Sequence, residues 1–260
     1  MKLACSSYSY HDELEDDMTL EEFFEICSTE LEIDGVELLD GHLPGDDIET
    51  IDHVADLLDE YDLEIACLSV FYNDFAKASN DERQADVEKV TKWLDHADRL
   101  GAPVLRGFTG FPGLHDRDHD DPEVWSDVAT CMQECVDYGQ TVETTFAIEN
   151  HNHDGLIRTA DDIFRVRGSV NGELGLVLDL SNYIDGEPSV NRTLHLADHV
   201  HAAYDDLADD GSEPNYPYYS ESLAALRDLG YDGFVTLEYE GDENDFEAVP
   251  AAVEYLKSCL

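Results

Sequence analysis

Four predicted strands of this chain each end in a side chain that can bind a metal ion. Residues 146–148 run into Glu149, 176–178 into Asp179, 199–200 into His201 and 234–237 into Glu238. Carboxylate and imidazole groups are costly to bury without partners, so at a strand end we expect them to face a site. If the four strands lie side by side and parallel, two glutamates, one aspartate and one histidine meet at one point.

Three carboxylates and one imidazole suit a divalent cation. Such an ion can bind the carbonyl and adjacent hydroxyl of a sugar and stabilise the enediolate that forms when a neighbouring carbon loses a proton. Glu149 and Glu238 could remove that proton and return it, with either glutamate as the base. The pattern alone therefore predicts a divalent-cation site with carboxylates that can also transfer protons.

The elements that must position these residues alternate between strand and helix along the chain. Runs rich in Val, Ile and Leu are typical of enclosed parallel strands, and apolar residues at helical spacing follow each one. The expected strands are residues 2–8, 36–39, 64–70, 104–107, 146–151, 174–180, 200–203 and 234–239. Eight such pairs in 260 residues predict a single (β/α)8 TIM barrel over 1–260, an α/β fold whose parallel eight-stranded barrel carries its functional residues at the strand ends.

Capping residues and loop lengths refine this picture. Asn80 and Thr159 are expected to cap helices, and Pro122 is a good first-turn residue. The segments 108–121 and 205–219 are long polar loops, and the first could act as a lid.

The charge of the chain restricts its partners. It carries 62 acidic and 14 basic residues, a formal charge of −48. Nucleic acids and anionic membranes are bound chiefly through Lys and Arg, so neither is an expected partner. The acidic residues are spread over every segment, as suits a salt-rich cytoplasm, where a Debye length of roughly 3 Å at 1 M screens self-repulsion. We expect a halophilic source and a protein weakened in low salt.

The hydropathy pattern predicts a cytoplasmic protein. No apolar stretch approaches the roughly 20 residues of a membrane span, and the N-terminus lacks a basic region followed by a hydrophobic one.

Six segments in order resemble the sugar phosphate isomerase and epimerase branch of the xylose isomerase-like barrel superfamily. They are residues 35–38 (GVEL), 100–106 (LGAPVLR), 147–151 (AIENH), 178–182 (LDLSN), 199–201 (HVH) and 231–239 (YDGFVTLEY). The resemblance implies one divalent metal ion, either Mn, Mg, Co or Zn, held by a Glu, Asp, His, Glu set. By resemblance these ligands are Glu149, Asp179, His201 and Glu238. Members of this kind are often oligomers, so a homo-oligomer is possible.

Departures from the resemblance concern the substrate. Asn182 stands where better characterised epimerases have a histidine, and residues 202–205 lack the positive charge that often follows the strand-seven histidine. These departures weaken the case for a phosphorylated substrate, so an unphosphorylated sugar, an inosose or a small keto acid is an equally good candidate. Arg106 could still hold an anionic group. The histidines of the related endonuclease branch are missing after Val70 and Arg106.

Several residues near the strand ends are candidates to bind the substrate. They are Glu37, His42, Tyr72, Arg106, Asn150, His151 and Asn182. For Glu37 an ion pair with a partner such as Arg106 is an equal alternative. His153 is expected in the strand-five loop, and His53 and His96 are expected to face solvent.

Aromatic residues could wall the pocket against the apolar face of a sugar, with ordinary packing as the alternative for each. They are Phe71, Tyr72, Phe108, Phe111 and Tyr204. The leading hypothesis is a metal-dependent isomerase or epimerase of a sugar, sugar phosphate or related hydroxy ketone. A dehydratase of a keto-inositol or similar ketone and a non-catalytic sugar-binding barrel are the alternatives.

Overall fold

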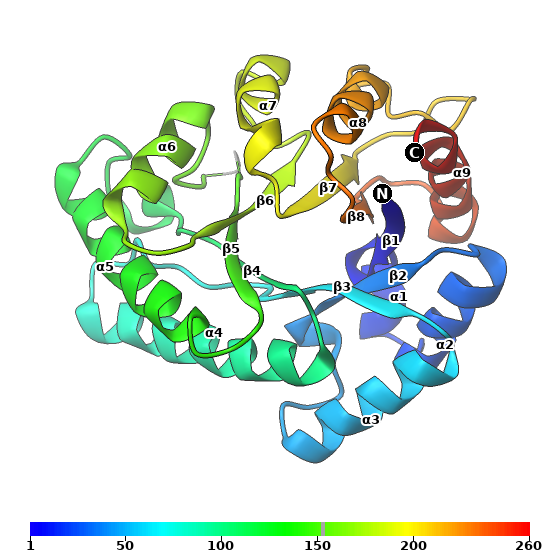
Figure 1. Cartoon of the computed structure of the whole chain (residues 1–260), viewed down its shortest axis with the longest axis horizontal. Helices are drawn as coiled ribbons and strands as arrows, with labels where there is room; N and C mark the ends of the chain where they lie inside the picture. The colour runs from blue at the N-terminus through cyan, green and yellow to red at the C-terminus, as the bar shows by residue number, and fades with distance from the viewer. Residues whose placement is uncertain (152–153) are drawn as a thin grey trace.

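Each predicted strand joins one closed parallel sheet in the computed structural model, which describes residues 1–151 and 154–260 (Figure 1). The strands are β1 (Lys2–Ser6), β2 (Gly35–Leu39), β3 (Glu64–Ser69), β4 (Val104–Gly107), β5 (Thr145–Glu149), β6 (Gly175–Asp179), β7 (His199–Tyr204) and β8 (Phe234–Tyr239). Neighbours in sequence are neighbours in the sheet, and β1 pairs with β8 to close it. The predicted (β/α)8 barrel is therefore confirmed.

Helices surround the barrel (Figure 1). They are α1 (His11–Glu15), α2 (Leu20–Glu25), α3 (Ile48–Glu60), α4 (Asn80–Leu100), α5 (Pro122–Gly139), α6 (Ala160–Ser169), α7 (Glu187–Thr193), α8 (Tyr219–Asp228) and α9 (Asp245–Cys259). Short 3-10 turns are η1 (Ser7–Tyr10), η3 (Asp40–His42), η4 (Pro112–His115) and η5 (Leu194–Leu196), and η2 (Ile26–Glu30) is a π-helical turn. Within the described part of the chain, every helix is too short or too polar to cross a membrane.

Local sequence signals set where several of these helices begin. Thr159 caps α6 through a capping box with Asp162, and Pro122 opens α5, both as predicted. The cap of helix α4 lies one residue earlier than predicted. The backbone of Ser79 is extended, and its hydroxyl accepts the amide proton of Glu82. Asn80 is therefore the first helical residue and not the cap.

The first strand is shorter than predicted. It was expected to reach Tyr8, but it ends at Ser6, whose side-chain oxygen accepts the amide proton of Tyr8 and starts the turn η1. The prediction for His96 was wrong, because its ring packs edge-on against Trp93 and only 7% of the residue is exposed. His53 is exposed, as expected.

The inside of the barrel changes from apolar to polar along the strands. A small apolar cluster from four adjacent strands comprises Cys67, Val104, Ala147 and Val177. Because side chains alternate between the two faces of a strand, residues two positions further on point the same way. Those residues are Ser69, Arg106, Glu149 and Asp179. Inside the barrel, a polar layer thus lies next to the apolar layer, on the side of the carboxyl ends of the strands.

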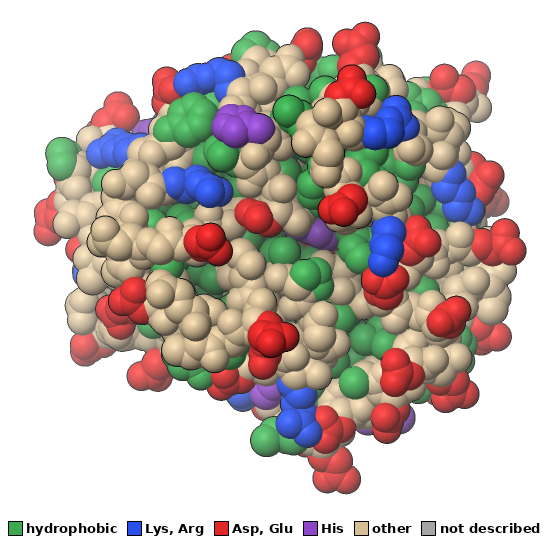
Figure 2. All heavy atoms as spheres, in the orientation of Figure 1, with side chains coloured by type: hydrophobic (Ala, Val, Ile, Leu, Met, Phe, Trp, Pro, Cys, Tyr) green, Lys and Arg blue, Asp and Glu red, His purple; other side chains and the backbone are tan. Residues whose placement is uncertain are grey.

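Acidic side chains are scattered over the whole face of the molecule that Figure 2 shows, with few basic side chains among them. Several of the 14 basic residues are already used in ion pairs, such as Lys2 with Glu64 and Arg99 with Asp52. Most of the 62 acidic residues consequently have no basic partner, and their mutual repulsion opposes the compact state.

We predict that thermal stability rises steeply with salt. Transfer from 0.1 M to 3 M KCl should raise the midpoint of thermal unfolding by at least about 10 °C, since screening several kcal/mol of repulsion is worth about 2–4 °C per kcal/mol in a chain of this size. Calorimetry across a KCl series measures this, with sucrose of equal osmolality as the uncharged control. Equal midpoints at both salt concentrations would contradict the repulsion argument.

Candidate active site

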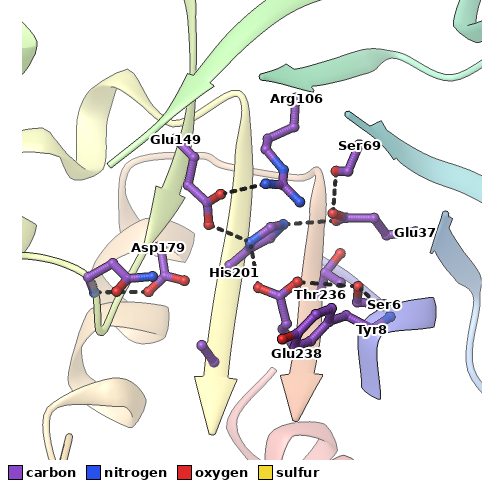
Figure 3. Close-up of polar contacts among 12 residues, drawn as sticks. Ser6, Tyr8, Glu37, Ser69, Arg106, Glu149, Asp179, His201, Thr236 and Glu238 are labelled. Atoms are coloured by element: carbon purple, nitrogen blue, oxygen red, sulfur yellow. Dashed lines mark hydrogen bonds and ion pairs between the residues drawn. The ribbon is translucent and has the colours of Figure 1, made fainter. Parts of the chain in front are cut away.

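The structure brings the four predicted metal-binding side chains together at the carboxyl end of the barrel (Figure 3). One donor atom each from Glu149, Asp179, His201 and Glu238 lies within 4.8 Å of the others, and all four residues are buried. His201 is central, because its Nδ1 lies 3.0 Å from Glu149 Oε1 and 3.4 Å from Glu238 Oε2. The group comes from the four adjacent strands β5 to β8.

One oxygen of the Asp179 carboxylate accepts three hydrogen bonds, and the other accepts none from the described residues. Its Oδ1 accepts the amide protons of Ser181 and Asn182 at 2.6 and 3.0 Å and the Ser181 hydroxyl at 2.7 Å. Its Oδ2 is buried and receives no hydrogen bond from residues 1–151 or 154–260. A buried carboxylate oxygen without a donor is costly, and a cation among the four ligands would supply the missing partner. The donor set therefore fits a divalent metal ion.

The backbone beside Asp179 is clamped by Asn150. The Asn150 amide accepts from the Asp179 N–H and donates to the Asp179 carbonyl, both at 2.9 Å. Both polar atoms of this side chain are thereby engaged with β6. Asn150, predicted to bind substrate, instead fixes the position of a neighbouring strand end.

Crowding of negative charge shifts the proton affinities of the cluster. Burial, reinforced by the Glu149 charge, raises the pKa of Asp179 to about 7. Burial lowers the pKa of His201, but the Glu37, Glu238 and Glu149 carboxylates outweigh it and raise that pKa well above its ordinary value. Without a cation the cluster therefore holds extra protons, which a bound cation would displace.

The two glutamates have different surroundings. Glu149 Oε2 forms an ion pair with Arg106 at 3.1 Å, and the Arg106 guanidinium lies 4.5 Å from the Phe108 ring centroid. Burial raises the pKa of Glu149, but Arg106 and His201 lower it overall. Glu238 accepts a longer hydrogen bond of 3.4 Å from the Ser6 hydroxyl.

A cavity of about 350 Å³ opens above the cluster. Its lining residues are Tyr8, Leu39, Phe71, Tyr72, Arg106, Phe108, Phe111, Glu149, His151, Asn182, Glu238 and Glu240. Four of the predicted substrate contacts are among them, namely Tyr72, Arg106, His151 and Asn182. The His151 ring stands edge-on to Phe108 and Phe111, at centroid distances of 5.2 and 5.7 Å.

Glu37 and His42, like Asn150, lie away from the cavity lining. Glu37 is fully buried beneath His201. His42 contacts the Ser7 hydroxyl at 2.8 Å through Nδ1 and His11 at 2.9 Å through Nε2. His153 lies outside the described residues.

Four of the five predicted wall aromatics line the cavity: Phe71, Tyr72, Phe108 and Phe111. Tyr204 does not, because it is fully buried and packs edge-on against Tyr219 at 5.9 Å. For Tyr204 the packing alternative is therefore correct.

Three residues of the cavity were not predicted from the sequence, namely Tyr8, Leu39 and Glu240. Tyr8 was assigned to the first strand, but the turn η1 turns it to the cavity, where its ring stacks on Phe71 at 6.3 Å. Glu240 lies two positions after Glu238, and strand alternation places it on the same side. That spacing was the available signal for Glu240, whereas Tyr8 had none.

The chain is a (β/α)8 barrel whose buried polar groups gather at the carboxyl ends of the strands, which is where barrels of this kind carry their functional groups. The chain belongs to the xylose isomerase-like TIM barrel family, whose profile matches residues 28–259.

Solved structures share the fold over the whole chain. A D-tagatose 3-epimerase-like protein is 22% identical with a TM-score of 0.79, covering 100% of this chain and 97% of the other. D-psicose 3-epimerase from Clostridium cellulolyticum H10, solved with D-tagatose, is 18% identical with a TM-score of 0.79 and coverages of 100% and 99%. The probable 3-DHS dehydratase of petrobactin synthesis from Bacillus anthracis is 17% identical with a TM-score of 0.77, covering 99% of both chains. None of the curated proteins matches the chain.

We predict that Asp179→Asn stabilises the metal-free protein at high pH. The pKa of Asp179 is raised from 3.8 to about 7 on folding, so the folded state is favoured by protonation of this carboxyl group. The stabilisation is fully present below pH 3.8 and is lost as the pH rises through about 7. Above pH 7 the wild type carries the whole penalty, up to about 4 kcal/mol, and asparagine does not.

Thermal unfolding in concentrated KCl with a chelator, at pH 5 and pH 8, measures the effect. The advantage of Asp179→Asn should be larger at pH 8, and the exposed Asp209→Asn should match the wild type at both. A wild type more stable than Asp179→Asn at pH 8 would refute the assignment of the buried charge.

Proposed function

We propose that this protein is a divalent-metal-dependent isomerase or epimerase of a sugar or related hydroxy ketone. The observation that carries the proposal is the convergence of three carboxylates and an imidazole on one point beside a cavity, where Asp179 Oδ2 accepts no hydrogen bond from the described part of the chain. Structural similarity to sugar epimerases supports the same class.

Glu149, Asp179, His201 and Glu238 would hold one ion of Mn, Mg, Co or Zn. When bound, such an ion supplies electrophilic stabilisation to the oxygens of an enediolate. The remaining chemistry is proton transfer by the chain itself. Glu149 and Glu238 are the two cluster carboxylates that line the cavity, so they are the groups that remove and return the proton of the reacting carbon.

Arg106 and the cavity wall would orient the substrate. Phe71, Tyr72, Phe108 and Phe111 offer apolar faces to a sugar ring or chain, while Arg106, His151 and Asn182 offer polar groups. Arg106 is already paired with Glu149. An unphosphorylated substrate suits this lining better than a phosphorylated one, because Arg106 is the one Lys or Arg residue that lines the described cavity, beside three glutamates.

A dehydratase is the second candidate. The same enolate, with a neighbouring hydroxyl expelled in place of reprotonation, gives a lyase, and one similar structure is a probable 3-DHS dehydratase.

The acidic composition supports a salt-rich cytoplasm as the place where the protein acts. A homo-oligomer stays a prediction.

Metal content tests the proposal first. Protein purified in high salt should contain about one equivalent of a divalent metal by elemental analysis, because the four ligands form one site. The double variant Glu149→Gln, Asp179→Asn should lose it, since two of the three carboxylate ligands become amides. A metal-free wild type that also fails to bind added cations would remove the proposed electrophile and favour a sugar-binding barrel.

Isotope exchange tests the role of the two glutamates. Incubation of metal-loaded enzyme with a panel of ketoses and inososes in D₂O should place one deuterium on the reacting carbon. Glu149→Gln and Glu238→Gln should each lower turnover by about 10²–10⁴-fold, the usual contribution of acid or base catalysis. Mass spectrometry separates an epimer from a dehydrated product, and assays at saturating metal separate lost chemistry from lost metal. Full activity in either variant would exclude that glutamate as the acid or base.

A further inference from the structure

Glu37 lies at the centre of a buried hydrogen-bond network directly beside the candidate metal ligands (Figure 3). Its Oε2 is 2.9 Å from His201 Nε2 and 3.0 Å from His199 Nε2. Its Oε1 accepts the Ser69 hydroxyl at 2.6 Å. Both carboxylate oxygens are thus occupied by protein donors, and the residue is 0% exposed, so it does not contact a substrate in the cavity.

The two ring nitrogens of His201 face different groups. Nδ1 faces Glu149 and Glu238, while Nε2 faces Glu37. A nitrogen that binds a metal must carry no proton, and a neutral imidazole then keeps its proton on the other nitrogen. A carboxylate at Nε2 accepts that proton in a hydrogen bond, which leaves the lone pair of Nδ1 directed at the other three ligands.

The surroundings of Glu37 hold it in this position. His199 precedes His201 by two residues on β7, so both rings point into the barrel. His199 Nε2 also lies 2.8 Å from the Thr236 hydroxyl on β8. The pairing of β2 with β3 shifts register between Val36 and Glu37, an irregularity of the kind that redirects a side chain next to a site.

A second cation beside Glu37 is the competing explanation. Glu37, Cys67 and His199 place one donor atom each within 4.8 Å of the others. However, Glu37 and His199 already satisfy each other, with Ser69 and Thr236 completing their hydrogen bonds. The oxygens of Glu37 therefore have donors without an ion, whereas Asp179 Oδ2 has none among the described residues.

We propose that Glu37 is the positioning residue that fixes His201 as a metal ligand through Nδ1, and that His199 and Ser69 hold Glu37 in place. The inference rests on the proposed metal centre and adds a residue that acts on the metal through His201 without touching the cavity.

The test is a Zn²⁺ titration of the whole 260-residue chain. The protein is first stripped of metal with a chelator, and binding is measured in concentrated KCl by isothermal titration calorimetry. Glu37→Gln keeps the size and an acceptor oxygen but removes the negative charge that holds the Nε2 proton of His201, and it should weaken Zn²⁺ binding about 10–100-fold. His199→Leu, which leaves the contact between Glu37 and His201 in place but removes a ring that stands edge-on to His201 at a centroid distance of 5.4 Å, should give a smaller loss. Cys67→Ala, which removes a barrel neighbour hydrogen-bonded to Leu68 and Ser69 and not to His201, is the control and should bind like the wild type.

A second readout separates positioning from general damage. In the Zn²⁺-loaded wild type, ¹⁵N NMR of the His201 ring should show the proton on Nε2, hydrogen-bonded to a carboxylate. In Glu37→Gln that proton signal should shift or divide between two states, while far-UV circular dichroism stays unchanged. If Glu37→Gln does not fold, the His199→Leu titration and spectrum decide the question.

The outcomes separate the two proposals. Equal Zn²⁺ affinity and an unchanged His201 spectrum in Glu37→Gln and His199→Leu would overturn the role of Glu37 and leave the metal centre standing. No binding by the wild type would overturn the metal centre itself. If the wild type binds two equivalents of Zn²⁺ and Glu37→Gln binds one, Glu37 belongs to a second cation site and the positioning role is overturned.

Discussion

The structure depends on one electrostatic constraint, the burial of three carboxylates around a single imidazole. Glu149, Asp179 and Glu238 share a space in which their donor atoms and that of His201 lie within 4.8 Å of one another. Charges that close, removed from water, cannot all remain ionised without a compensating positive charge. Arg106 compensates one of them, and His201 takes up part of the rest. Asp179 Oδ2 accepts no hydrogen bond from the residues that the structure describes, and a cation held by the four side chains would supply the missing partner.

The barrel makes this constraint possible. Four adjacent parallel strands deliver their terminal side chains to one point because their hydrogen-bonded register fixes each end relative to the next, as in the pairing of Asp179 with His201. The surrounding groups then divide into two sets. Residues above the cluster, such as Arg106 and Phe108, line the cavity, whereas Glu37 and His199 lie among the strands and contact only protein. In the proposed function, the residues that line the cavity would bind the substrate, and the buried residues would orient the metal ligands.

The strand ends could be predicted from sequence, but the roles of their neighbours could not. Apolar runs ending in Glu149 or Glu238 are local signals that need only the period of a strand. By contrast, Asn150 was expected to meet substrate, yet its amide matches the backbone of β6, a contact 29 residues away in sequence. Glu37 meets His201 across 164 residues. Such pairings depend on register and on the irregularity between β2 and β3, which no local pattern encodes. Tyr8 was missed because a single serine cap ends β1 early.

The most direct test of the central claim is a crystal structure with Mn²⁺, using anomalous diffraction to locate the ion. The account predicts a single strong anomalous peak bonded to Glu149, Asp179, His201 and Glu238, with Asp179 Oδ2 and His201 Nδ1 among the bonded atoms. A peak bound instead by Glu37, Cys67 and His199, or no peak within the barrel at saturating Mn²⁺, would contradict it.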